Sequence, residues 1–305
     1  MRAIDHNTIT DAALDQMNGT PDPRLKQIME SLVRHLHSFA REVDLTPEEW
    51  LEGIKFLTAV GQKCTPFRQE FILLSDTLGF SSLINALHDR RAIEDGTKTS
   101  LLGPFYRQDS PEMNLGDCIV KSPRQQVVIY GKVTDVQGQG IPNASVEIWQ
   151  TDEDGTYDLQ KETGAPDAIP DMDMRGRFRA DANGNYYMRT VLPLGYMIPM
   201  DGPVGAMIIA QKRHGYRPSH IHFLIGAPGY RELVTALYAK GDDHIDSDTV
   251  FGVTDSLVVD VDKNDPNSPL QGYPSIRYDF SLAAAAKDGM GRVGADPSQI
   301  TKVGA

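Results

Sequence analysis

Apolar side chains in the first ninety residues recur at steps of three and four, which is the spacing of amphipathic helices. From Pro23 to about Val43 they form one continuous stripe made of Leu25, Ile28, Met29, Leu32, Val33, Leu36, Phe39, Ala40 and Val43. Asp22 stands before Pro23, as an N-cap residue stands before a proline at the first helical position. The pattern therefore predicts a long helix that begins at Pro23.

Two further signals for the start of a helix follow along the chain. At the first of them Thr46 is a cap, Pro47 opens the helix and Glu49 completes a capping box. The other begins at Thr65, in TPFRQEF, and its apolar positions continue to Leu87. We expect three or four helices in this span, with wide apolar faces that pack against each other or against a second subunit.

After a connector over about residues 90–114, the apolar period changes to two, with β-branched runs between turn residues. The runs QVVIYGKVTDV and ASVEIWQ, joined at QGQG, are typical of a hairpin, and so are GRFRAD and NYYMRTV around ANG. Further strands are predicted at AMIIAQK, HIHFLIG, LVTALY and SLVVDV. Short strands without intervening helices favour a β-sandwich or a barrel.

The composition limits the partners of the protein. The 305 residues carry 42 acidic and 30 basic side chains, and this net charge of -12 argues against binding to nucleic acid or to an anionic membrane. No signal peptide is evident, and no run reaches the roughly 18 apolar residues that span a bilayer. Cys64 and Cys118 form no CxxC pair, so a reducing compartment is expected. We predict a cytoplasmic protein.

The stretch RPSHIHF, residues 217–223, contains two histidines one residue apart. In a strand, His220 and His222 point to the same face and can share one metal ion. The alternative is a polar outer face, or one core histidine beside an exposed one. By contrast His35 and His37 fall in the predicted first helix, where residues two apart lie about 200° apart around the axis.

The remaining ligands of such a metal are less clear from the sequence. A thiolate zinc site lacks cysteines near the pair, and the iron(II) pattern begun by HID at His244 lacks a later histidine. The acidic loop TDEDGTYD, aligned from Asp152, lacks the glycine and glutamate of a calcium loop and is interpreted as a turn. Oxygen ligands from tyrosine remain, and two phenolates suit a trivalent iron. Spacing does not select two among the eleven tyrosines.

Five segments taken together resemble one known family. They are LLGPFYRQDSPE (101–112), GIPNASVEIWQTDEDGTYD (140–158), RGRFRADANGNYYMRTVLP (175–193), YMIPMDGPVG (196–205) and RPSHIHF. In this order they are similar to the intradiol ring-cleavage dioxygenases, the catechol 1,2-dioxygenase group. The resemblance implies an α+β fold, with a helical N-terminal dimerisation region and connector (1–100) and an antiparallel β-sandwich catalytic domain (101–282). The small and polar residues after them indicate a loosely held tail (283–305).

The resemblance also implies a site and a reaction. Tyr157, Tyr196, His220 and His222 would bind one Fe(III), at which O2 cleaves an aromatic diol. Tyr196 would also act as a base when the substrate displaces it, and Arg217 would stabilise negative charge on the ring. Family members form homodimers through the helical region, where some hold a lipid. The segment LQKETGAPDAIPDMDM after Tyr157 is long for the family and is expected to form a surface loop.

The predicted substrate pocket rests on the same resemblance. Its residues are Leu83, Ala86, Leu101, Leu102, Gly103, Pro104, Phe105, Ile198, Pro199 and Ala236. The runs YMIPMDGPVG and GDDHIDSDTVFGV are similar to hydroxyquinol 1,2-dioxygenases, and Ala236 stands where catechol-type members carry glutamine. These features favour hydroxyquinol (benzene-1,2,4-triol) as the substrate and 3-hydroxy-cis,cis-muconate as the product. The alternatives are catechol or a chlorocatechol and, in another class, a non-catalytic β-sandwich binding module.

Overall fold

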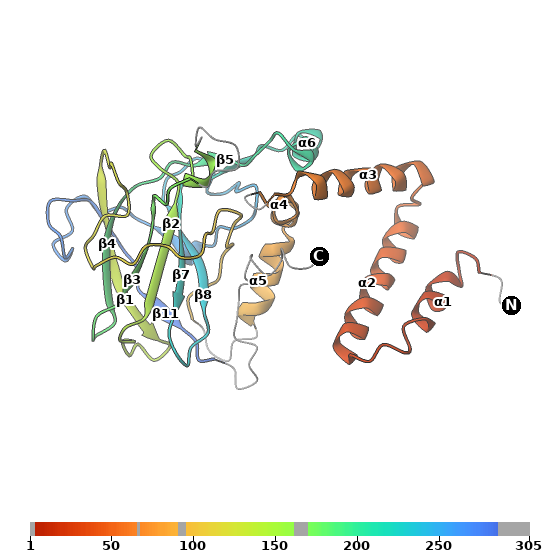
Figure 1. The fold of residues 1–305 in the computed structure, drawn as a ribbon, viewed down its shortest axis with the longest axis horizontal. Coiled ribbons are helices and arrows are strands. Elements are labelled where there is room, and N and C mark those ends of the chain that lie inside the picture. The colour runs from red at the N-terminus through yellow and green to blue at the C-terminus, as the bar shows by residue number, and fades with distance from the viewer. Residues whose placement is uncertain (1–3, 66–67, 91–95, 162–169, 286–305) are drawn as a thin grey trace. The chain divides into compact units, whose positions relative to one another are not determined.

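A computed structural model of the chain describes residues 4–65, 68–90, 96–161 and 170–285. The chain divides into two compact units, Met1–Ala59 and Val60–Ala305. The first holds α1 (Ile9–Asp15), α2 (Pro23–Glu42) and most of α3 (Pro47–Lys63). Figure 1 shows the helices at the N-terminal end of the chain and the strands after them.

Both predicted helix caps are confirmed. The Asp22 carboxylate accepts hydrogen bonds from the backbone N–H groups of Arg24 and Leu25, at 2.8 and 3.2 Å. Thr46 and Glu49 form the capping box, with a side chain-to-backbone bond in each direction at 3.2 and 3.0 Å. These contacts satisfy N–H groups that have no partner within a helix, so they define where α2 and α3 begin.

Within the described residues of the single chain, nothing buries the apolar stripe of α2. No residue of α2 is buried, and its large apolar side chains are exposed: Leu25, Ile28, Met29, Leu32, Leu36 and Phe39. The first part of α3 exposes Trp50, Leu51, Ile54 and Leu57 in the same way. Exposed apolar groups gathered over two helices are typical of a surface that another molecule covers.

The third predicted helix is wrong in its start and its length. Helix α4 (Glu70–Thr77) begins at Glu70 rather than just after Thr65, and α5 (Phe80–Arg90) follows as a separate helix. Gly79 between them has a φ of +72°, which a glycine adopts without strain and which ends a helix. Within the described residues no single helix meets the length and hydropathy of a membrane span. Only α4 and α5 taken as a pair do so, and they are bent by 72°.

Two sheets of the second unit form the sandwich. One contains β1 (Gln126–Asp135), β4 (Asn185–Val191), β10 (Ser275–Arg277) and β11 (Phe280–Leu282). The other runs in the order β3 (Arg175–Arg179), β2 (Ser145–Gln150), β7 (His220–Gly226), β8 (Leu233–Ala239) and β9 (Val258–Val259). A buried apolar core that includes Ile129, Met188, Ile148 and Phe223 draws side chains from strands of both sheets. The predicted sandwich after an N-terminal helical region is confirmed.

Both predicted hairpins are wrong. Strand β1 pairs with β4, β10 and β11, whereas β2 pairs with β3 and β7, so each predicted turn carries the chain from one sheet to the other. Alternation of apolar residues fixes which face of a strand is buried, but it does not fix the neighbouring strand. Most pairs are antiparallel; β1–β10, β1–β11 and β8–β9 are parallel.

The run AMIIAQK is not a strand. It lies mostly in α6 (Pro203–Ala210), whose first residue is a proline, as is usual for a helix. Short apolar runs do not distinguish a buried helix from a strand by period alone. The prediction for the C-terminal tail lies outside the described residues from 286 onward, and that for the long loop does so over 162–169.

Candidate metal and substrate site

His220 and His222 lie on the central strand β7 and face one buried space. They are 3% and 1% exposed, and their ring centroids are 4.7 Å apart. Trp149 pairs with His222 across β2 and β7, and the two rings stack at 5.0 Å with an interplanar angle of 3°. The same-face prediction for this pair is confirmed, and a broad aromatic surface supports one of the two rings.

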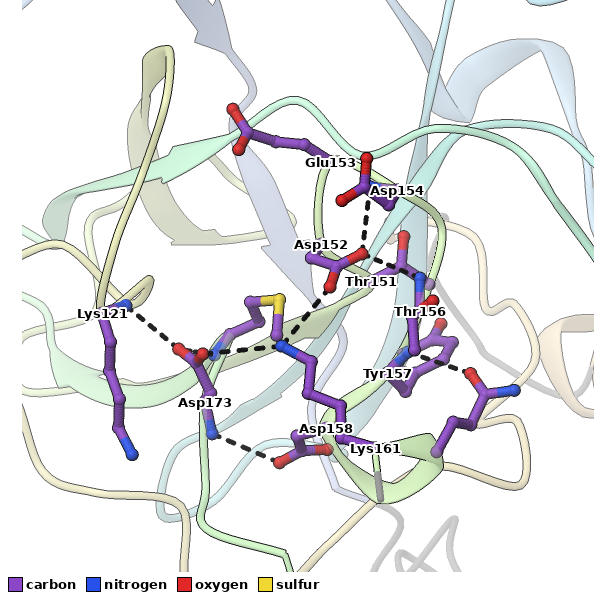
Figure 2. Close-up of polar contacts among 12 residues, drawn as sticks. Lys121, Thr151, Asp152, Glu153, Asp154, Thr156, Tyr157, Asp158, Lys161 and Asp173 are labelled. Carbon is purple, nitrogen blue, oxygen red and sulfur yellow. Dashed lines mark hydrogen bonds and ion pairs between the residues drawn. The ribbon is translucent and has the colours of Figure 1, made fainter. Parts of the chain in front are cut away.

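Tyr157 reaches the same space from the acidic loop after β2. The Asp152 carboxylate accepts the N–H groups of Asp154 and Thr156 at 3.0 and 2.9 Å, which closes the loop into a turn (Figure 2). The N–H of Tyr157 then donates to the side chain of Gln160 at 2.9 Å. Fixing the backbone on both sides of Tyr157 directs its ring inward, where it is fully buried.

Tyr196 comes from the short strand β5 (Tyr196–Met197), which pairs with β6 (Tyr216–Arg217). Its ring centroid lies 5.6 Å from that of Tyr157 and 5.6 Å from that of His220. Because β6 ends three residues before His220, one short chain segment holds Tyr196, Arg217 and the histidines together. The four predicted ligands therefore form one buried cluster.

Burial fixes the protonation of the cluster in the absence of a cation. It lowers the pKa of His220 and His222 well below the usual value, helped by Arg217 for the former and by His220 for the latter. It raises the pKa of Tyr157 and Tyr196, although the charge of Arg217 opposes this. Both imidazoles are thus neutral, which is the form that binds metals.

One contact also selects the tautomer of His220. Its Nδ1 lies 2.7 Å from the carbonyl oxygen of Pro218, which can only accept a hydrogen bond, so the proton is on Nδ1. The lone pair is then on Nε2, to which Nη1 of Arg217 donates at 2.9 Å. A backbone carbonyl that holds Nδ1–H in this way is a common arrangement behind a metal-binding histidine.

The residues present fit a hard trivalent cation. Among the described residues, the buried Tyr157 hydroxyl has no hydrogen-bond partner of good geometry, which is costly unless something else satisfies it. The described residues contain no group of three or more His, Cys, Asp or Glu that could hold a metal. A cation in this cluster therefore needs phenol oxygens as well as imidazoles, and two phenolates would offset most of a triple charge.

A buried ion-pair cluster behind Tyr157 escaped the sequence analysis. Asp158 is 1% exposed and accepts hydrogen bonds from Arg175 (Nε, 2.7 Å) and Arg107 (Nη1, 3.0 Å). Arg175 also donates to the carbonyl oxygen of Phe105 at 3.2 Å, and the Phe105 ring stacks on Tyr157 at 4.4 Å. The cluster thereby fixes both the chain after Tyr157 and the ring that covers it.

Arg217 is 3% exposed and lies against the cluster with its charge balanced. Its Nε and Nη2 donate to the Asp248 carboxylate at 3.2 and 3.4 Å, and Nη2 lies 3.4 Å from the Tyr238 hydroxyl. A buried arginine needs such a partner. The sequence offered no signal for Asp248, which is one of several aspartates in GDDHIDSD.

Asp76, on α4, gives the site a pH-dependent neighbour. Burial raises its pKa to about 6 from a usual 3.8; a hydrogen bond with Ser81 and the charge of Arg217 lower it, and Asp248 raises it. Between pH 3.8 and about pH 6, Asp76 keeps its proton in the folded protein but has lost it in the unfolded chain. Stability is therefore lost as the pH rises through this window, and the loss is complete above the folded-state pKa.

Replacing Asp76 by asparagine is expected to remove this dependence of the stability on pH. The free energy of unfolding at about pH 7.5 should rise by up to about 3 kcal/mol, and that at about pH 4 should change little. Denaturant unfolding of both proteins at the two pH values measures the difference. An equal change at both pH values would contradict the assignment.

The predicted pocket residues are distributed around the cluster. Pro104, Phe105 and Pro199 line a cavity of about 460 Å³, together with Leu73 and Met197. Ala86 and Leu101 line another of about 660 Å³, bounded by α5 and by residues 251–254.

The other predicted pocket residues line neither cavity. Leu83 is 53% exposed, whereas Ile198 and Ala236 are buried, the latter opposite His222 in β8. Leu102 is half-buried. Gly103 has a φ of +74°, and a Cβ there would lie 3.6 Å from the His222 ring.

The fold and the cluster define a class of protein: a β-sandwich with a candidate metal centre built from phenol and imidazole groups. Two family models match the chain. One, described as dioxygenase, covers residues 103–284, and the other, described as catechol dioxygenase N terminus, covers residues 22–96. The chain belongs to the intradiol ring-cleavage dioxygenases and is an enzyme. The alternative of a non-catalytic binding module is not supported.

Several relatives are similar over most of their length. The 6-chlorohydroxyquinol 1,2-dioxygenase of Cupriavidus pinatubonensis is 44% identical, over 85% of this chain and 92% of its own. The hydroxyquinol 1,2-dioxygenase of Corynebacterium glutamicum is 41% identical, over 93% of this chain and 95% of its own. The crystal structure of hydroxyquinol 1,2-dioxygenase from Pseudomonas putida has a TM-score of 0.82 at 45% identity, and covers 92% of this chain and 99% of that one.

Proposed function

We propose that the protein cleaves hydroxyquinol with O2 between the two adjacent hydroxyl-bearing carbons, at a non-haem Fe(III) held by Tyr157, Tyr196, His220 and His222. The observation that carries this proposal is the buried cluster of two phenols and two neutral imidazoles, with Arg217 beside it. Relatives over more than four fifths of the chain carry the names of hydroxyquinol and 6-chlorohydroxyquinol 1,2-dioxygenases, which supports the choice of substrate.

The side chains have separate roles in this proposal. When bound, Fe(III) supplies a Lewis acid that draws electron density from a chelated aromatic diol and makes its ring reactive toward O2. Tyr157 and Tyr196 balance the charge of the ion as phenolates, and Tyr196 takes up a proton from a substrate hydroxyl. Arg217 stabilises negative charge that develops on the ring carbons, and its burial strengthens this interaction because little water screens it.

The substrate preference is tested by comparing kcat/KM for hydroxyquinol, catechol and a chlorinated catechol. We expect hydroxyquinol to exceed catechol by at least about tenfold, because a third hydroxyl adds a polar contact that catechol lacks. Equal or higher kcat/KM for catechol would assign the enzyme to the catechol-type members instead.

We further propose a cytoplasmic homodimer with residues 1–100 as its interface region and connector and residues 101–282 as the catalytic domain. The exposed apolar side chains of α2 and the first part of α3 support this, since a second copy would cover them. A lipid chain between the copies would fit the same apolar surface. Sedimentation should give a dimer that Leu32→Glu dissociates, and a monomeric wild-type protein would contradict the interface.

A further inference from the structure

The loop between β8 and β9 supplies the contacts that hold the guanidinium of Arg217. Asp248 in this loop accepts hydrogen bonds from Nε and Nη2 of Arg217, and the hydroxyl of Tyr238, near the end of β8, also lies 3.4 Å from Nη2. Asp248 is itself almost fully buried, so its carboxylate has little access to water. A further polar partner of the guanidinium is Nε2 of His220, at 2.9 Å.

The hydrogen bond between Arg217 and Nε2 of His220 would be lost if His220 bound iron, as the proposed function requires. The Nδ1 proton of His220 is committed to the Pro218 carbonyl, so Nε2 is the nitrogen with a lone pair for a metal. A lone pair that binds a metal cannot also accept a hydrogen bond from Arg217. With a metal on His220 this contact would be lost, and the hydrogen bonds with Asp248 and Tyr238 would remain to hold the guanidinium.

Asp248 also closes the loop that surrounds the guanidinium. Its carboxylate accepts the N–H groups of Val250 and Gly252 at 3.3 and 3.0 Å. Gly252 packs so closely that a Cβ there would lie 2.6 Å from the Tyr238 hydroxyl, 3.0 Å from Nη2 of Arg217 and 3.1 Å from Oδ2 of Asp248. No positive φ requires glycine at this position, so the lack of space is the reason for it.

We propose that Asp248 and Gly252 form a cradle that positions Arg217 for the ring-cleavage reaction. Asp248 fixes the orientation of the guanidinium through two nitrogen atoms, and the missing side chain of Gly252 leaves the space in which it lies. Both are positioning residues that act through Arg217. The inference rests on the proposed function, because it concerns where the charge of Arg217 is held relative to the substrate.

Gly252→Ala is the sharper of two test variants, because it removes the space in which the guanidinium lies and keeps both charged groups of the ion pair. Asp248→Asn removes the charge of the partner and keeps a side chain of the same shape. Gly226→Ala is the matched control, since a Cβ at Gly226 meets nothing within 4 Å. Each substitution is made in the wild-type chain and in Arg217→Ala, and kcat and KM for hydroxyquinol are measured with the visible spectrum of the iron-loaded protein.

In the wild-type chain we expect Gly252→Ala and Asp248→Asn to lower kcat by about 10- to 100-fold, since a misplacement of about 1 Å costs that much. KM should change less than about threefold and the visible band should remain. In the Arg217→Ala chain the same substitutions should change kcat by less than about twofold, because the group that they position is gone. Gly226→Ala should keep the kcat of the wild-type protein.

Two results would contradict this proposal. One is an unchanged kcat in Gly252→Ala, and the other is a loss of kcat in the Arg217→Ala chain as large as in the wild-type chain. If Asp248→Asn does not fold, Gly252→Ala carries the test alone. Failure of the proposed function is distinguishable, because the wild-type protein would then not turn over hydroxyquinol at all.

Discussion

Replacing Tyr157 by phenylalanine is expected to remove both the visible colour of the iron-loaded protein and its turnover. The substitution keeps the stacking on Phe105 and deletes only the oxygen atom. Fe(III) would lose one of two anionic ligands in a buried site, which leaves its charge poorly balanced. We expect the site to bind Fe(III) too weakly to keep it, so that turnover falls by about a thousandfold or more and the tyrosinate-to-iron absorption is lost with the iron.

Tyr186→Phe is the matched control for this variant. Tyr186 is also almost fully buried, and its hydroxyl donates to the Tyr278 carbonyl at 2.7 Å within the sandwich core. Its loss should cost about 1 kcal/mol of stability and leave the spectrum unchanged. A Tyr157→Phe protein that keeps the wild-type band and iron content would show that Tyr157 is not a ligand.

Arg217→Ala should behave differently, with its colour retained and most turnover lost. None of the four proposed ligands is changed, so iron content and the absorption band should stay close to wild type. Removing a preorganised charge beside the reacting ring is expected to lower kcat by about 100- to 1000-fold. Stopped-flow mixing of the iron-loaded, substrate-bound protein with O2 measures the step directly.

Arg189→Ala provides the control for Arg217. Arg189 lies on β4 and donates to the Gly116 carbonyl at 2.8 Å, so it is also a hydrogen-bonded, partly buried arginine. Its loss should affect stability alone. If Arg217→Ala lost its colour in parallel with its turnover, Arg217 would serve the metal site as a structural support instead of acting on the substrate.

The sequence predicted the half of the site that depends on local spacing. Histidines two apart on a strand share a face whatever surrounds them, and the structure places His220 and His222 4.7 Å apart. Along the chain Tyr157 and Tyr196 are separated by β3 and β4, which belong to different sheets, and only the resemblance to a family selected the two tyrosines. Contacts between distant segments leave no periodic signal in either segment.

The same limit explains the errors in the fold and the residues that were missed. Most of the longer strands were predicted, but the short strands β5, β6, β10 and β11 were not. Strands β1 and β2 were paired although they belong to different sheets. Asp248 stands among similar aspartates, and only its distance to Arg217 distinguishes it. Gly252 is one of 27 glycines, and only the side chains packed against it, those of Tyr238, Arg217 and Asp248, distinguish it from the others.

The most direct test of the proposed function is an anaerobic titration of the iron-loaded protein with hydroxyquinol, followed by admission of O2. The account predicts a visible band that shifts on binding, then uptake of one O2 for each substrate and formation of the ring-opened 3-hydroxy-cis,cis-muconate. A band that does not respond to hydroxyquinol, or O2 uptake that yields an aldehyde acid from cleavage beside the diol, would contradict it.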